Sequence, residues 1–190
     1  PLKKSHELYY ILGNIQKKLK KYKIAVVSFE NALKLNPKFS EAYNSLGNVK
    51  KSLNFRDEAE RYYKKAISLK EDNIEALLNL TTILKENKKY YDLILVYQKI
   101  LKLDEKNTKT IYNLGSAHLF LGDIPKAQEY FKKVIDIDHL HIPSYRNYIS
   151  VTKIDEKNNI FKKLSEINLN NLDLENQILS FNALSKSYFD

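Results

Sequence analysis

The chain has 190 residues, contains no cysteine and carries a formal net charge of +9. The absence of cysteine excludes disulfide bonds and thiolate metal sites, and no apolar run approaches the roughly 20 residues that a membrane-spanning helix needs. Because no signal peptide precedes the first predicted helix, we expect a cytoplasmic protein that does not enter the membrane.

The predicted elements repeat along the chain every 34 residues, and the clearest copy is 40–73. One position of the unit is large and apolar, at Tyr9, Tyr43, Leu77, Ile111 and Tyr145. The position four residues later usually holds a small residue, and its copies are Gly13, Gly47, Thr81 and Gly115. The second half of the unit carries an aromatic residue, at Phe29, Tyr63, Tyr97 and Phe131. Recurrence in phase over four copies indicates an internal repeat.

Each unit is predicted to form two helices. With Ser40 as position 1, the residues at positions 4, 7, 8 and 11 lie on one face at 100° per residue, which predicts a first helix, helix A. Positions 20, 24, 27, 28 and 30 make the apolar face of a second helix, helix B. A helix–turn–helix period of 34 with these residue types resembles the tetratricopeptide repeat. The resemblance implies an all-α, right-handed solenoid of antiparallel helix pairs, in which stacked units bury each other's apolar faces.

In chain order, we expect one solenoid over 1–190, with repeats at 6–39, 40–73, 74–107 and 108–141. An irregular helical extension over 142–177 and the start of a further repeat at 178–190 follow. Asn73 and Asn107 are predicted to cap the helices that follow them, and Asp123 with Pro125 marks the start of another. His118 takes a core position of its repeat, and we expect it to be buried.

The C-terminal part carries a second resemblance. The segment YRNYISVTKID, followed by a degenerate helix and then LSFNALSKSY, is similar to the segment that joins such repeats to the enzyme in bacterial repeat–sulfotransferase fusion proteins. None of that enzyme's nucleotide-binding loop is present in these residues. Since the chain starts without methionine and stops inside a predicted helix, we expect it to be a piece of a longer protein.

The candidate binding surface is the face of helix A that points away from positions 4, 7, 8 and 11. Position 6 places Asn79, Asn113 and Asn147 at 34-residue spacing. They resemble the asparagine ladder of O-linked N-acetylglucosamine transferase, whose amides hold the backbone of an extended peptide. An asparagine offers both a donor and an acceptor for that purpose. The alternative is an amide that is solvated or bonded to a neighbouring helix.

The full set predicted for this peptide-binding groove is Asn44, Asn48, Asn79, Thr82, Lys109, Tyr112, Asn113, Ser116 and Asn147. Tyr112, Leu119 and Phe120 are groove-side residues that could anchor a partner's side chains, or could pack against the irregular fifth unit.

The carboxylate clamp of chaperone cofactors finds matches in Asn48, Asn79 and Lys109. Asn44 and Asn113 replace its required Lys and Arg, so two of three cationic contacts are missing, which argues against chaperone-tail binding.

Basic residues form a second candidate surface. Position 12 of helix A provides Lys17, Lys51 and Lys85, which could contact an acidic partner. Helix-dipole complementarity is the alternative, because bases favour the last turn of a helix. Residues 1–39 hold nine lysines and two acidic residues, yet no motif for nucleic-acid binding accompanies them, so we do not expect a nucleic-acid partner.

No catalytic constellation is recognisable. His139 and His141, with Asp136 and Asp138, are the only cluster of metal-ligand types, and we interpret it as a polar turn. We expect no cofactor and no enzymatic activity in this chain.

The predicted function is a scaffold that binds an extended protein or peptide segment in the helix-A groove. The alternative is a non-catalytic arm of a larger sulfotransferase or glycosyltransferase. Self-association is a third expectation, through an apolar end-face formed by Phe181, Leu184 and Tyr188.

Overall fold

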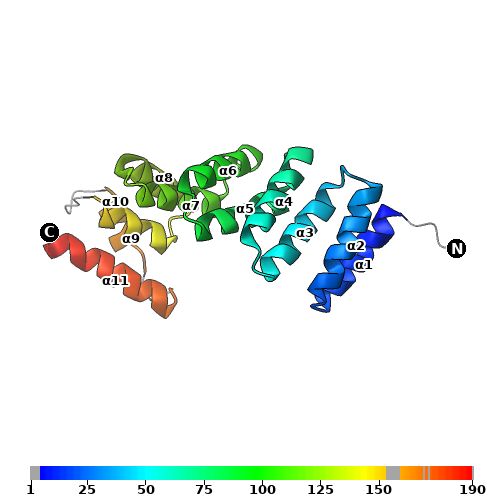
Figure 1. Ribbon diagram of the computed structural model, residues 1–190. Coiled ribbons are helices and arrows are strands. Elements are labelled where there is room, and N and C mark those ends of the chain that lie inside the picture. Colours follow the sequence, from blue (N-terminus) through cyan, green and yellow to red (C-terminus); the bar gives the residue numbers. More distant parts are fainter. Residues whose placement is uncertain (1–4, 153–158, 169, 171, 190) are drawn as a thin grey trace. The chain divides into compact units, whose positions relative to one another are not determined.

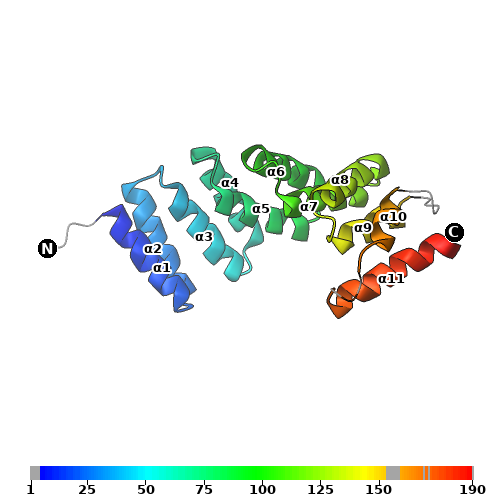
Figure 2. The ribbon, with the colours of Figure 1, turned by 180° about the vertical axis from the view of Figure 1, so that it is seen from behind.

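The computed structural model describes residues 5–152, 159–168, 170 and 172–189. These residues form eleven α-helices and no strand (Figures 1 and 2). The helices are α1 (His6–Lys18), α2 (Tyr22–Leu35), α3 (Ser40–Ser52), α4 (Arg56–Leu69), α5 (Ile74–Glu86), α6 (Tyr90–Leu103), α7 (Thr108–Phe120), α8 (Ile124–Ile137), α9 (Ile142–Ser150), α10 (Asn159–Ser165) and α11 (Leu174–Phe189). The all-α fold of helix pairs predicted from the repeat is therefore confirmed.

The chain divides into two compact units, 1–96 and 97–190, and the division lies inside α6. In the first unit α1 packs against α2 and α3 against α4, while α2 contacts α3 and α4 contacts α5. In the second unit α7 packs against α8, α8 contacts α9, and α11 lies against α9. The first unit thus builds its core from helices that are neighbours in sequence, as repeat proteins do, whereas in the second unit α11 also packs past α10 onto α9.

A left-handed residue ends helix A at position 15 in each of the four regular repeats. These residues are Lys20, Asn54, Lys88 and Gly122, with φ between 54° and 76°. The next amide reaches back to the carbonyl five residues earlier, for example from Phe55 to Lys50 at 2.9 Å, which is the Schellman pattern of helix ends. Only Gly122 adopts this conformation without steric cost. Lys20, Asn54 and Lys88 adopt the same turn as residues with a Cβ atom, and asparagine tolerates the left-handed region better than lysine.

The small residue of helix A lies directly under the aromatic ring of helix B. A Cβ atom added to Gly47 would lie 2.6 Å from Cε1 of Tyr63, and one added to Gly115 would lie 2.7 Å from Cε1 of Phe131. Both rings are fully buried. The recurring pair of a glycine and an aromatic residue is thus a contact that sets how closely the two helices approach.

The predicted helix caps are confirmed. Asn73 Oδ1 accepts a hydrogen bond from the backbone N–H of Ala76 at 3.0 Å, and Asn107 Oδ1 accepts one from Thr110 at 2.9 Å. Asp123 caps α8 in the same way through Lys126 at 3.4 Å. His118 is buried as expected, and its Nδ1 lies 3.1 Å from Asp123 Oδ2.

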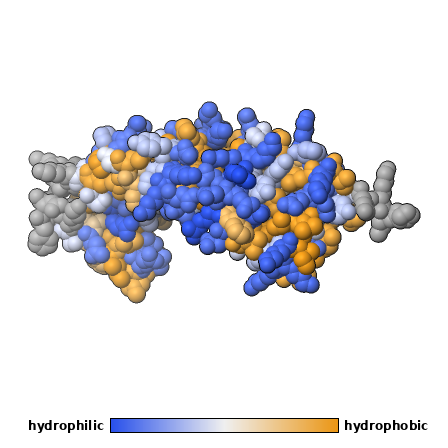
Figure 3. Space-filling model, viewed as in Figure 1, coloured by the Kyte–Doolittle hydropathy of each residue, from blue (hydrophilic) through white to orange (hydrophobic). Residues whose placement is uncertain are grey.

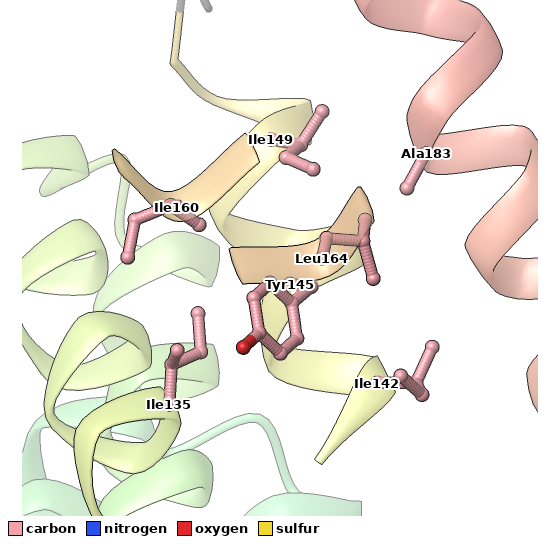
Figure 4. Close-up of a cluster of buried hydrophobic side chains, with 7 residues drawn as sticks. All are labelled: Ile135, Ile142, Tyr145, Ile149, Ile160, Leu164 and Ala183. Atoms are coloured by element: carbon pink, nitrogen blue, oxygen red, sulfur yellow. The ribbon is translucent and has the colours of Figure 1, made fainter. Parts of the chain in front are cut away.

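The C-terminal helices share a separate apolar cluster (Figure 4). The cluster consists of Ile135, Ile142, Tyr145, Ile149, Ile160, Leu164 and Ala183. Leu184 packs against it, whereas Phe181 is 59% exposed. Leu184 and Phe181 therefore lie on different sides of α11, and self-association through this end-face stays a prediction. The side chain of Tyr188 lies outside the described residues.

Candidate functional site

The residues predicted for the peptide groove belong to four helices of the two units. Asn44 and Asn48 lie on α3 and Asn79 and Thr82 on α5, all in the first unit. The second unit holds four more on α7 and one on α9, which are Lys109, Tyr112, Asn113, Ser116 and Asn147. We describe the two sets separately.

In the first unit the ladder residue Asn79 is bonded to the preceding repeat. Its Nδ2 donates to Oδ1 of Asn44 at 3.0 Å. Asn44 is only 3% exposed, so little of its side chain is open to a partner, and its place in the groove stays a prediction. In this repeat position 5 faces the next helix A, α5, and from there Asn44 holds the amide of Asn79 in place. Asn79 keeps its carbonyl oxygen and its second N–H for other contacts.

The second unit repeats this relation with a different pair. Asn147 Nδ2 donates to the hydroxyl oxygen of Tyr112 at 3.0 Å, again from position 6 to position 5 of the preceding repeat. The ring of Tyr112 lies 5.7 Å from that of Phe131 and 5.0 Å from that of His141. The ring of Tyr112 therefore packs within its own repeat, while its hydroxyl bonds Asn147 of the irregular fifth repeat. Its role as a partner anchor stays a prediction. The side chain of Asn147 also accepts from Arg146 at 3.2 Å.

Asn113 differs from the other two ladder residues. Position 5 of the preceding repeat is Leu78, which has no acceptor or donor. Asn113 is half-buried, and among the residues that the structure describes its side chain has no hydrogen-bond partner. Its amide N–H groups and its carbonyl oxygen are therefore all available, whereas Asn79 and Asn147 each use one N–H in a hydrogen bond to the preceding repeat.

The polar residues at position 9 are turned toward their own repeat. The hydroxyls of Thr82 and Ser116 donate to the carbonyls of Leu78 and Tyr112, at 3.3 and 3.1 Å, so their oxygens remain as acceptors. Asn48 Oδ1 accepts from the Tyr63 hydroxyl at 2.8 Å. Burial, followed by the nearby charges of Glu75 and Glu86, raises the pKa of Tyr63, which keeps this hydroxyl protonated.

The lysines predicted for an acidic partner lie in the last turns of their helices. Lys17 and Lys51 are half-buried and Lys85 is exposed. Within the described ranges none of them forms an ion pair. Lys109, at the groove edge, is exposed as well. The positions of Lys17, Lys51 and Lys85 satisfy the helix dipole, so their arrangement by itself requires no partner.

The described part of the chain holds neither a metal-binding cluster nor a membrane-spanning helix. No three His, Cys, Asp or Glu side chains gather there as a metal site would require. None of the helices in that part is both long and apolar enough to cross a bilayer.

Comparisons with known proteins agree with the repeat. Sequence profiles of the tetratricopeptide repeat match residues 6–39, 40–73 and 108–138. No curated protein matches the chain significantly. Among solved structures, YrrB, described as a tetratricopeptide repeat protein with an unusual peptide-binding site, is similar with a TM-score of 0.69 at 20% identity, covering 93% of this chain and 90% of its own.

Two further structures have the same fold. A MamA fragment from Desulfovibrio magneticus RS-1 has a TM-score of 0.68 at 15% identity and covers 100% of this chain and 98% of its own. PilF of Pseudomonas aeruginosa has a TM-score of 0.60 at 18% identity and covers 96% of this chain and 76% of its own. The matching profiles span just over half of the residues, and the glycine–aromatic contact recurs in the helix pairs. The chain therefore belongs to the tetratricopeptide repeat family.

Proposed function

We propose that this protein is an interaction scaffold whose helix-A surfaces bind an extended peptide segment of a partner through asparagine amides. The observation that carries the proposal is the availability of Asn113. It is a half-buried amide on a helix-A surface, and no described residue bonds its side chain. An amide of this kind can donate to a peptide carbonyl and accept from a peptide N–H.

The neighbouring ladder residues support the same role. Asn79 and Asn147 are each held at 3.0 Å by a side chain of the preceding repeat. A side chain that is already fixed loses less conformational entropy when it binds. The similar structure of YrrB, described as having a peptide-binding site, is consistent with this use of the fold.

Hydrogen bonds alone would give weak binding. At about 0.5–1.5 kcal/mol net for each bond, Asn113 and Asn147 of the second unit, making one or two bonds each, supply a few kcal/mol, which corresponds to about millimolar affinity. Apolar anchors must add to this. Phe120, on α7 in the same unit as Asn113, has a large apolar side chain that is 66% exposed, and it fits a partner with an apolar residue.

The test is a peptide-array screen, followed by titration of the hits against wild type, Asn113→Ala and Asn113→Asp. Since Asn113 has no intramolecular partner among the described residues, Asn113→Ala should leave folding intact and weaken binding roughly threefold to tenfold. Asn113→Asp keeps the acceptors but removes the donor, so it should also weaken binding. Asn182→Ala, an exposed helical asparagine on α11, is the matched control.

Peptides that bind wild type and both Asn113 variants with the same affinity would refute the role of the ladder. The alternative of a non-catalytic arm in a larger sulfotransferase or glycosyltransferase uses the same surface. It would be favoured if the recovered peptides contained the residues that such an enzyme modifies, and it stays a prediction until then.

A further inference from the structure

A cavity of about 410 Å³ lies in the second unit, between the turn that follows α8 and the turn that follows α10. Its lining comes from those two turns, from α9 and from the end of α10. Each turn leads into a further helix, α9 and α11 respectively. The volume is within the range of about 300–1,000 Å³ that is usual for pockets that bind small molecules.

Part of the cavity wall is apolar. Ile167 and Leu172 line the cavity and also pack against the apolar cluster of the C-terminal helices. Leu140, which is 51% exposed, adds an aliphatic side chain from the turn after α8. Figure 3 shows apolar residues at the surface of this part of the second unit, over α10 and α11. A ligand with an apolar body therefore buries hydrocarbon surface when it enters the cavity.

A buried hydroxyl without a partner belongs to the same lining. Tyr145 lines the cavity and is fully buried, and its hydroxyl has no hydrogen-bond partner among the described residues. Figure 4 shows this hydroxyl on the side of the ring that faces Ile135 of α8. Burial, followed by the charges of Asp136 and Asp138, raises its pKa, which agrees with a position toward the end of α8. Because an unbonded buried hydroxyl costs free energy, a polar ligand atom that bonds it is stabilised.

The charged residues of the lining differ in whether their charge is balanced. Lys163 Nζ donates to Asp136 Oδ1 at 2.7 Å, so its charge is already compensated. Glu166 is exposed, and within the described ranges it forms no ion pair. Among the residues that line the cavity, the unbalanced charge is therefore the negative charge of a carboxylate. Such a charge favours a cationic ligand over an anionic one.

We propose that this cavity binds a small organic amine, in which an ammonium group is carried on an apolar body. The apolar body contacts Leu140, Ile167 and Leu172, and the ammonium group pairs with the carboxylate of Glu166. An ammonium N–H donates to the hydroxyl oxygen of Tyr145, which keeps its acceptor lone pairs when the hydroxyl is protonated. The site shares no residue with the asparagine surface, so it is separate from the proposed binding of a peptide.

The test is a titration followed by ¹H–¹⁵N chemical shifts, with three probes that share one aromatic body. These are 2-phenylethylamine, which is a cation, 2-phenylethanol, which is neutral, and 3-phenylpropionate, which is an anion. The amine should bind at least about fivefold more tightly than either of the others, since only the amine matches the carboxylate. The shifts that change should belong to the α8–α9 turn and to the end of α10.

Two variants separate the polar contacts from the apolar wall. Glu166→Gln should weaken binding of the amine roughly twofold to fivefold and leave 2-phenylethanol unaffected. Tyr145→Phe should weaken the amine roughly twofold to tenfold. Glu129→Gln, at an exposed carboxylate on α8, is the matched control and should bind all three probes like wild type.

Equal affinity for the three probes would overturn the proposal, as would an amine that binds both variants as tightly as wild type. Shifts that stay unchanged around the cavity up to about 10 mM amine, or that change only elsewhere in the chain, would overturn it as well. Far-UV circular dichroism checks folding. Glu166→Gln alters an exposed side chain, so it keeps the proposal falsifiable should Tyr145→Phe fail to fold.

Discussion

At the scale of single residues, two buried tyrosines show how differently the same side chain is accommodated. Tyr63 is fully buried, and its hydroxyl donates to Asn48 at 2.8 Å. Tyr145 is also fully buried, but its hydroxyl has no hydrogen-bond partner among the described residues. Burial, together with the charges of Asp136 and Asp138, raises the pKa of Tyr145 to about 12. Both groups are therefore neutral at physiological pH, and only one of them is satisfied.

Replacing each tyrosine by phenylalanine should have opposite consequences. Tyr63→Phe removes a bond and should lower the free energy of unfolding by about 0.5–1.5 kcal/mol. Tyr145→Phe removes a buried hydroxyl that makes no bond, so stability should stay the same or rise. Urea unfolding followed by circular dichroism measures both. Equal destabilisation by the two changes would mean that the Tyr145 hydroxyl is bonded in solution.

At the scale of elements, a buried carboxylate joins α4 to the turn before α6. Glu60 is 6% exposed, and its two oxygens accept from Lys64 and Lys89, each at 2.8 Å. Burial alone would raise the pKa of Glu60, but the bonds from the two lysines outweigh it and the pKa is lowered. Lys89 belongs to the next repeat, so this ion pair stabilises the contact between repeats.

Glu60→Gln should destabilise the protein in a pH-dependent manner. Because the folded pKa lies below the ordinary value of 4.5, the contribution of the carboxylate is fully present above that pH and is lost as the pH falls through the lowered pKa. At neutral pH we expect a loss of about 1–2 kcal/mol, since the lysine ends are partly exposed.

Thermal unfolding at pH 7 and at decreasing pH measures this loss. Glu58→Gln, on the same helix but with a more exposed carboxylate that pairs with Lys50, should cost about 0–1 kcal/mol. A Glu60→Gln effect that persists unchanged in acid would show that the charge is not its origin.

At the scale of the whole molecule, the division into two compact units predicts that damage stays local. Gly115→Ala places a methyl group 2.7 Å from the ring of the buried Phe131. Overpacking of this kind costs about 1–3 kcal/mol, more than the roughly 0.5–1 kcal/mol that alanine gains over glycine in a helix. Repeats interact mainly with their neighbours, so only nearby helices should respond.

Native-state hydrogen exchange tests this locality. In Gly115→Ala the amides of α7 and α8 should exchange faster, while those of α1 and α2 stay as in wild type. Glu129→Ala, an exposed change on α8, should alter neither set. A uniform increase across all helices would show that the chain unfolds as a single cooperative unit.

The repeat pattern predicted much of the architecture and part of the candidate site. Helix caps such as Asn73 and core residues such as His118 depend on contacts inside one repeat or with its direct neighbour. Such contacts can be predicted from the residue types at those positions. The boundaries of the repeats and the use of the asparagine ladder stay predictions. The burial of Asn44 was not predicted. Asn44 stands at position 5 of its repeat and Asn79 at position 6 of the next, and this pair of amides was the signal that the two side chains bond each other.

The amino-acid sequence by itself determined the helix pairs, their period and the face of each helix that is apolar, because these follow from residue spacing along one helix. Only the tertiary structure decided which of those faces are covered. Leu12 and Leu46 occupy the same position of the repeat, yet Leu46 is buried and Leu12 is exposed. The physical reason is that burial depends on which helix lies next in space, and an identical position in the repeat does not encode its neighbour.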